Sequence, residues 1–154
     1  MLRTTARRSR PPEAEQAAFE LLVNLAREYG TRVHIVHLAS AEAVAVVKRA
    51  RAEGLRITGE TCPHYLTFAA EDVPDGATEF KCAPPIRERR QQEMLWEALG
   101  EGDIDLVVTD HSPCPAELKS TEGRGLADAW GGISSLQLGV AVGWSAARKR
   151  AHTL

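Results

Sequence analysis

The chain has 154 residues, of which 44% are hydrophobic and 26% are charged, and its 19 basic and 21 acidic side chains leave a formal net charge of -2. This composition is typical of a globular α/β protein. The balanced charge argues against nucleic acid as a partner. A membrane partner is not expected either, because no run approaches the roughly 18 apolar residues of a membrane span.

The three cysteines, Cys62, Cys82 and Cys114, form neither a CxxC pair nor an even set. This pattern favours reduced thiols in a cytoplasmic protein over a disulfide framework or a zinc finger. We interpret Cys62 and Cys114 as small buried hydrophobic residues, because neither has an adjacent base that would make it a nucleophile.

The N-terminal part of the chain predicts a leader, a helix and a strand. Residues 1–8 contain arginines and no acidic residue, and we interpret them as a disordered or artefactual leader. Apolar residues at helical spacing predict a helix over residues 13–28 that ends at Gly30. A β-rich run over residues 32–38 predicts a strand that is buried on both faces.

A second helix and strand follow. Ser40 is expected to cap a helix over residues 41–53. Residues 55–62 predict the next strand, and residues 64–85 predict a long loop with a short strand near Phe80.

The last part of the chain predicts one more strand between two helices. A helix after Arg87, closed by Gly100, leads to a strand over residues 104–109. A final helix is expected from about Ser134, and residues 149–154 form a basic tail. Strands that alternate with helices predict parallel βαβ units, so their polar ends should gather at one edge of the sheet.

Taken singly, the polar residues at these strand ends permit more than one interpretation. His37 suits a metal ligand or a hydrogen-bonded core histidine. Asp110 suits a ligand, a helix cap or a salt bridge, and His64 is ambiguous in the same way. His34 lies three residues before His37, so only one of the two can face a site. The basic cluster at residues 87–90 indicates a solvated face.

Four motifs favour the functional interpretation of these polar residues, because the motifs occur in order and at consistent intervals. They are HIVHL at residues 34–38, ETCPHY at 60–65, KCAPPIR at 81–87 and TDHSPCP at 109–115. Together they resemble the carboxyl-terminal half of the cyclic amidohydrolases, the family of dihydroorotases, hydantoinases and allantoinases. Over residues 9–148, the resemblance implies an α/β fold that comprises about the last three βα units of a (β/α)8 TIM barrel of the metal-dependent amidohydrolase type.

The motif variants narrow the resemblance within this family. The KCAPPIR and DHSPC forms, together with AWGGI at residues 129–133, are most similar to the allantoinases. Dihydroorotases usually have Asn where Ala83 stands and Ala where Ser112 stands, which argues against dihydroorotate as substrate. The resemblance implies hydrolytic ring opening of a cyclic ureide, allantoin to allantoate, and a homo-oligomer is compatible with a full-length protein.

The resemblance also implies a site. In the family, two metal ions, usually zinc, activate a hydroxide that attacks the ring amide carbon, and an aspartate carries its proton to the leaving nitrogen. His37 corresponds to one metal ligand, and Asp110 corresponds to both a ligand and the catalytic aspartate. The backbone at Ala83, Gly131 and Gly132 corresponds to substrate-binding positions, with ordinary turn positions as the alternative. No metal ligation is carried over to His64 or His111.

The remaining family ligands have no counterpart here. The chain contains no HxH pair, and Lys48 and Lys81 come after the His37 position. The resemblance therefore implies that about five strands are absent, that the isolated chain is inactive, and that open strand edges make it weakly stable. Two alternatives remain: one half of a two-chain hydantoinase- or dihydroorotase-like enzyme, and a non-catalytic amidohydrolase-like subunit.

Overall fold

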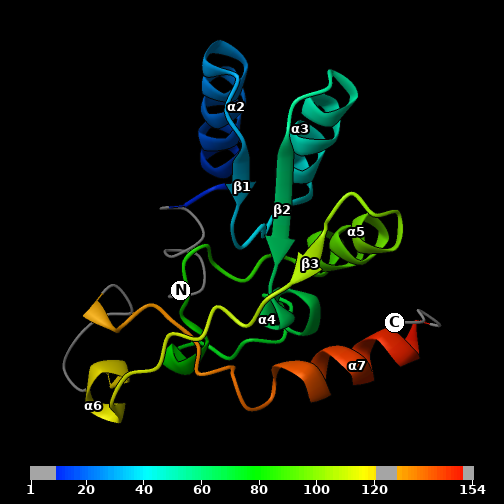
Figure 1. Ribbon diagram of the computed structural model, residues 1–154. Coiled ribbons are helices and arrows are strands. Elements are labelled where there is room, and N and C mark those ends of the chain that lie inside the picture. The colour runs from blue at the N-terminus through cyan, green and yellow to red at the C-terminus, as the bar shows by residue number, and fades with distance from the viewer. Residues whose placement is uncertain (1–9, 121–127, 151–154) are drawn as a thin grey trace.

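A computed structural model describes residues 10–120 and 128–150, which form an α/β fold with one parallel sheet (Figure 1). The sheet contains β1 (Val33–Ile35), β2 (Ile57–Thr61) and β3 (Leu106–Val107), hydrogen-bonded in that order. Both pairings are parallel, as the alternation of strands and helices predicts. The leader at residues 1–8 and residues 151–154 of the basic tail lie outside the described residues.

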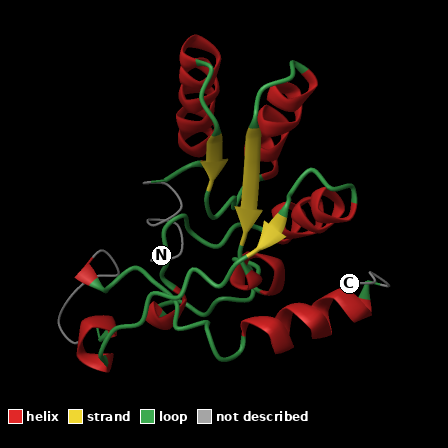
Figure 2. Cartoon of the chain, viewed as in Figure 1, coloured by secondary structure: helices red, strands yellow, loops and turns green. Residues whose placement is uncertain are grey.

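The helices lie along the sheet and beyond its carboxyl edge. They are α2 (Pro12–Tyr29), α3 (Ala41–Ala52), α4 (Pro63–Thr67), α5 (Arg89–Gly100), α6 (Ala116–Lys119) and α7 (Gly139–Lys149). Contacts join α2 to α3, α3 to α5 and α4 to α7. Figure 2 shows α4 and α7 beyond the arrowheads of the strands, so the strand ends point toward these two helices.

Helix α2 follows its sequence pattern closely. Its second residue is Glu13, an acid in the first turn, and Gly30 ends the helix with a left-handed backbone at φ 61. Phe19, Val23 and Ala26 are buried at helical spacing. The prediction of a helix over residues 13–28 is therefore confirmed, with one more residue at each end.

The core lies between the helices and the strand ends. The largest buried side chains include Ile35, Leu38, Leu66, Leu95 and Val47. Two buried polar groups bridge this core to the backbone: the Thr61 hydroxyl donates to the Leu38 carbonyl at 2.7 Å, and the indole of Trp96 donates to the Leu66 carbonyl at 2.9 Å. The first bond fixes the end of β2 against the chain that leaves β1, and the second fixes α5 against α4.

One prediction about the strands is wrong. The first predicted strand was expected to be buried on both faces, yet Val36 is 46% exposed. Leu106 and Val107 of β3 are also 41% and 40% exposed. β1 and β3 are the edge strands of this sheet, and the described part of the chain leaves Val36, just after β1, and both residues of β3 uncovered.

Other differences concern the loops and caps. The strand predicted near Phe80 is a 3-10 turn over Thr78–Phe80, and the predicted loop contains part of α4. The last helix begins at Gly139 rather than about Ser134. Ser40 lies at the N-cap of α3, but its hydroxyl makes no cap hydrogen bond.

The cap of α3 comes instead from a residue distant in sequence. The amide of Ala41 donates to the side-chain carbonyl of Gln91 at 2.7 Å, and the Gln91 amide group donates to Glu42 at 2.8 Å. A side chain of α5 therefore satisfies the first turn of α3, which local sequence reasoning cannot find.

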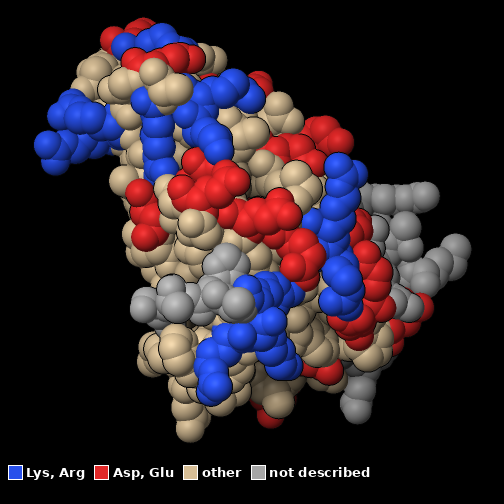
Figure 3. Space-filling model, turned by 90° about the vertical axis from the view of Figure 1, so that its right-hand side faces the viewer, with Lys and Arg blue, Asp and Glu red and all other residues tan. Residues whose placement is uncertain are grey.

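The surface carries both signs of charge. Figure 3 shows basic and acidic side chains side by side over one face, in line with the nearly balanced composition. Among the helices that the structure describes, none has both the length and the apolar character needed to cross a membrane.

Candidate functional site

The two predicted metal ligands lie just beyond the ends of strands and have the same unusual backbone conformation. His37 and Asp110 follow β1 and β3, and each has φ 43. A left-handed residue other than Gly costs about 1–2 kcal/mol, so surrounding contacts must hold it. After His37, the amide of Leu38 donates to the Glu60 carbonyl at 2.7 Å, which ties this bend to β2.

The two histidines of the first motif have different surroundings. His34 contacts Thr58 through Nδ1 at 2.7 Å and Glu60 through Nε2 at 2.8 Å. His37 contributes to a pocket, and its Nδ1 is buried with no hydrogen-bond partner in the described part of the chain. The expectation that only one of them faces the candidate site fits this arrangement.

A cluster of metal-binding side chains lies at the same edge. Cys62 follows β2, His64 is in the first turn of α4, and Asp110 follows β3. One ligand atom from each, sulfur, ring nitrogen or carboxylate oxygen, lies within 4.8 Å of the other two. Cys62 and His64 are buried and Asp110 is exposed. Among the residues that the structure describes, neither ring nitrogen of His64 has a hydrogen-bond partner.

Burial controls the electrostatics of this cluster. It lowers the pKa of His64 to about 4, and the Asp110 carboxylate opposes this change. It also raises the pKa of the Cys62 thiol well above its ordinary value, with a further contribution from the charge of Asp110. Without a ligand, the cluster therefore holds a neutral imidazole and a neutral thiol at pH 7.

The prediction that Cys62 is buried is confirmed. Cys114, for which burial was also predicted, is only partly buried. All three cysteines are free thiols.

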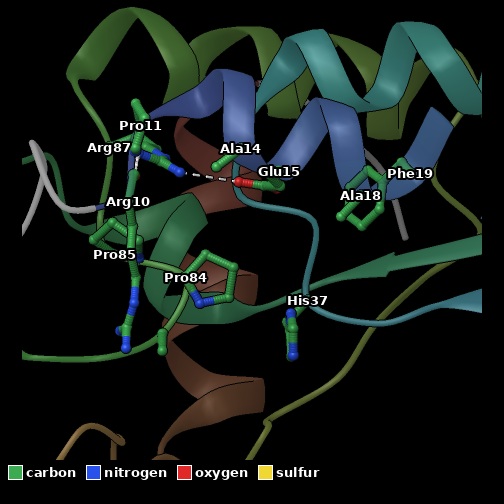
Figure 4. A pocket seen from close by; sticks show the side chains of 11 residues that line it. Arg10, Pro11, Ala14, Glu15, Ala18, Phe19, His37, Pro84, Pro85 and Arg87 are labelled. Atoms are coloured by element: carbon green, nitrogen blue, oxygen red, sulfur yellow. Dashed lines mark hydrogen bonds and ion pairs between the residues drawn. The ribbon is translucent and has the colours of Figure 1, made fainter. Parts of the chain in front are cut away.

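A pocket of about 360 Å³ lies beside His37 (Figure 4). We call it the His37 pocket. It has a mainly apolar lining made of Arg10, Pro11, Ala14, Glu15, Ala18, Phe19, His37, Ala83, Pro84, Pro85 and Arg87. Two predicted site residues, His37 and Ala83, therefore share one pocket.

A buried ion pair closes one side of this pocket. Glu15 and Arg87 lie 3.1 Å apart, and their side chains are only 6% and 5% exposed. The other Glu15 oxygen accepts hydrogen bonds from the amides of Ala39 at 2.8 Å and Ser40 at 3.1 Å. Arg87 also donates to the carbonyl of Arg10 at 2.7 Å. The pair joins α2, the chain after His37 and the KCAPPIR segment.

The sequence interpretation missed this pair. Residues 87–90 were expected to form a solvated face, which is wrong for Arg87 because it is buried. Glu15 lies four residues before Phe19, so it shares the buried face of α2. An acid on an apolar helix face was the available signal for a buried partner.

The predicted substrate-binding positions come together from distant segments. Ala83 is exposed in the His37 pocket, and the Tyr65 hydroxyl donates to the carbonyl of the following Pro84 at 2.8 Å. The amide of Gly132 donates to the Lys81 carbonyl at 2.9 Å. Gly131 is exposed and Gly132 is buried. Substrate binding by these three positions stays a prediction.

The two glycines differ in the space around them. A Cβ added at Gly132 would lie 2.5–2.7 Å from atoms of Ser112, including its carbonyl oxygen, whereas at Gly131 it would meet no atom of the described residues within 4 Å. Gly132→Ala is therefore expected to lower the free energy of unfolding by about 1–3 kcal/mol, as overpacking does. Gly131→Ala is the matched control, with a change within about 0.5 kcal/mol. Urea unfolding measures both, and equal midpoints for the two variants would refute the steric argument.

The hydrogen bonds of His111 have a structural role. Its Nδ1 accepts hydrogen bonds from the amides of Ser135 and Leu136, both at 3.1 Å. His111 also forms a parallel bridge with Ile133. The ring therefore orients the chain that follows Gly132.

Comparisons with known proteins agree with this picture. No family model matches the chain. It is 54% identical over 146 residues to an allantoinase of Streptomyces avermitilis, covering 95% of this chain and 32% of that relative. It is also 47% identical to the mitochondrial allantoinase of Aquarana catesbeiana, covering 95% of this chain and 30% of that relative.

Solved structures match as well. The dihydropyrimidinase of Brevibacillus agri superposes with a TM-score of 0.90 at 29% identity, over 97% of this chain and 34% of that one. The D-hydantoinase of Bacillus sp. AR9 gives 0.87 at 30% identity, over 99% of this chain and 34% of that one.

The four motifs and these matches show that the chain is homologous to one part of the cyclic amidohydrolases. Within this family it is homologous to the allantoinases. The chain spans about a third of the length of the curated relatives that it matches.

Proposed function

We propose that the chain supplies the carboxyl-terminal part of the active site of an allantoinase, which opens allantoin to allantoate by hydrolysis. The observation that carries this proposal is the position of His37 and Asp110. The motifs that contain them resemble the family motifs, and both residues follow parallel strands at one edge of the sheet. The 54% identity to an allantoinase supports the choice of substrate within the family.

We further propose that the three strands belong to a (β/α)8 barrel as consecutive members. The match to about a third of the dihydropyrimidinase chain supports this interpretation. The exposed apolar side chains of Val36, Leu106 and Val107 also support it, because further strands would cover them. In such barrels the active site lies at the carboxyl ends of the strands.

Zinc is the metal that we propose for the complete site. The residues present fit a part of this site: His37 has a buried ring nitrogen that no described residue hydrogen-bonds, and Asp110 presents an exposed carboxylate. These two would be the ligands that this chain contributes. When bound, the metal ions activate water and polarise the ring carbonyl.

Asp110 then performs the proton transfer. As the water oxygen bonds to the ring carbonyl carbon, the Asp110 carboxylate accepts the proton that the water loses. It delivers this proton to the ring nitrogen when the carbon–nitrogen bond breaks. Backbone groups at Ala83, Gly131 and Gly132 would hold the cyclic ureide, which is the small-molecule partner that we propose. We propose a cytoplasmic location on the cysteine pattern alone.

A chimera tests this proposal. The chain replaces the matching third of the Streptomyces avermitilis allantoinase, and the release of allantoate is measured with zinc present. The chimera is expected to be active, and Asp110→Asn is expected to lower its turnover by about 10²–10⁴-fold. Asp72→Asn is the matched control, because this exposed carboxylate pairs with Arg89 and is not a member of the cluster.

The same assay measures the chain alone. Negligible turnover is expected, since His37 and Asp110 are too few ligands for two metal ions. Allantoate production by the isolated chain would contradict this expectation. A folded, zinc-loaded chimera that hydrolyses hydantoin or dihydrouracil but not allantoin would overturn the substrate assignment.

A further inference from the structure

The cluster at the strand ends contains two side chains that the proposed reaction does not use. The family resemblance assigns roles to His37 and Asp110, but to neither Cys62 nor His64. Cys62, His64 and Asp110 nevertheless offer three ligand atoms within 4.8 Å of one another. They come from the end of β2, from α4 and from the end of β3, so three separate elements fix them.

The geometry suits a single small cation. Bonds of about 2.0–2.3 Å from zinc to nitrogen, oxygen and sulfur place neighbouring ligand atoms about 3–4 Å apart in a tetrahedral site. Atoms that already lie within 4.8 Å need to move by only about 1 Å. Asp110 is exposed and can make most of this adjustment.

His64 provides an independent observation. This residue is only 3% exposed, and neither of its ring nitrogens has a hydrogen-bond partner within residues 10–120 and 128–150. Burying an imidazole in this state costs free energy that a ligand would recover. One of its ring nitrogens lies within 4.8 Å of both the Cys62 sulfur and an Asp110 oxygen.

We propose that Cys62, His64 and Asp110 form a mononuclear site for a borderline or soft divalent cation such as Zn²⁺, with water as the fourth ligand. The donor set of one thiolate, one imidazole and one carboxylate matches the preferences of zinc. On binding, the S–H bond of Cys62 breaks, its proton passes to solvent, and a bond forms from sulfur to the metal with no change of oxidation state. The site needs only these three side chains, so it goes beyond the proposed allantoinase function and does not rest on it.

The test uses the metal-free full chain and Co²⁺ as a spectroscopic substitute for Zn²⁺. One Co²⁺ is expected to bind per chain and to give the near-ultraviolet charge-transfer absorption of a cobalt–thiolate bond, which Zn²⁺ then removes by displacement. Cys62→Ser is expected to abolish this absorption. Cys82→Ser is the matched control, because Cys82 is a second buried cysteine outside the cluster.

Two further variants test the other ligands. His64→Gln and Asp110→Asn are each expected to weaken Co²⁺ binding at least about tenfold while the thiolate absorption persists at saturation. Asn tolerates the left-handed backbone at position 110, and that side chain is exposed, so this variant tests the site even where Cys62→Ser fails to fold.

Three outcomes would overturn the proposal. They are the absence of any thiolate absorption, its loss in Cys82→Ser or Cys114→Ser but not in Cys62→Ser, and unchanged Co²⁺ affinity in both His64→Gln and Asp110→Asn. These readouts concern binding to the chain itself. An inactive chimera would therefore remove the allantoinase proposal and leave this one standing.

Discussion

Arg87→Met is expected to lower the free energy of unfolding by about 3–5 kcal/mol, because it leaves the Glu15 carboxylate buried without its cation. The two side chains are 5% and 6% exposed and lie 3.1 Å apart. The loss also frees the Arg10 carbonyl, which accepts from Arg87 at 2.7 Å. Urea unfolding followed by circular dichroism measures the change, and a chain of marginal stability would lose its cooperative transition.

An exposed ion pair supplies the matched control. Arg27 and Glu53 are 47% and 50% exposed, so Glu53→Gln is expected to cost at most about 1 kcal/mol. The double variant with Glu15→Met and Arg87→Met should recover only part of the loss, because the amides of Ala39 and Ser40 then lack their acceptor. If Arg87→Met lowers the free energy of unfolding no more than Glu53→Gln does, the buried pair does not hold the three segments together.

Between pH 6.5 and pH 4, the metal-free chain is expected to lose up to about 3 kcal/mol of stability through His64 alone. Burial lowers the pKa of this ring from its ordinary value of 6.5 to about 4. In this window the unfolded chain binds a proton that the folded chain excludes, so acid favours unfolding. The contribution is fully present above pH 6.5 and reaches its limit below about pH 4.

Urea unfolding at several pH values between 7 and 4 measures this dependence. His64→Gln should flatten the curve, because it removes the titrating group while carboxylates continue to contribute. His34→Gln is the matched control, since His34 has partners at both ring nitrogens, Thr58 and Glu60. Identical pH dependence in wild type and His64→Gln would show that this ring is not held neutral by burial.

Local patterns predicted much of the fold. The spacing of Phe19, Val23 and Ala26 defines the buried face of α2, and Gly30 ends it. The β-rich runs around Ile35 and Ile57 become β1 and β2, although each strand is shorter than predicted. Helix periodicity and terminating glycines act over a few residues, so they can be found in the chain itself.

The features that escaped prediction depend on contacts between distant residues. Glu15 meets Arg87 across 72 positions, and Gln91 caps α3 across 50. For the site, the motifs indicated His37 and Asp110, but no short-range pattern indicates that Cys62 and His64 lie beside Asp110. Only the pairing of β2 with β3 brings these residues together.

The left-handed backbone at His37 and Asp110 also affects how substitutions at these positions are interpreted. A β-branched residue would be strained at φ 43, whereas Asn, Asp, His and Gly accept such angles most readily. Apart from Gly, these are also residue types that bind metal ions. The backbone conformation and the chemistry of metal binding thus favour overlapping sets of residues at both positions. Asp110→Asn therefore separates the two requirements, because Asn accepts the left-handed backbone and removes the carboxylate.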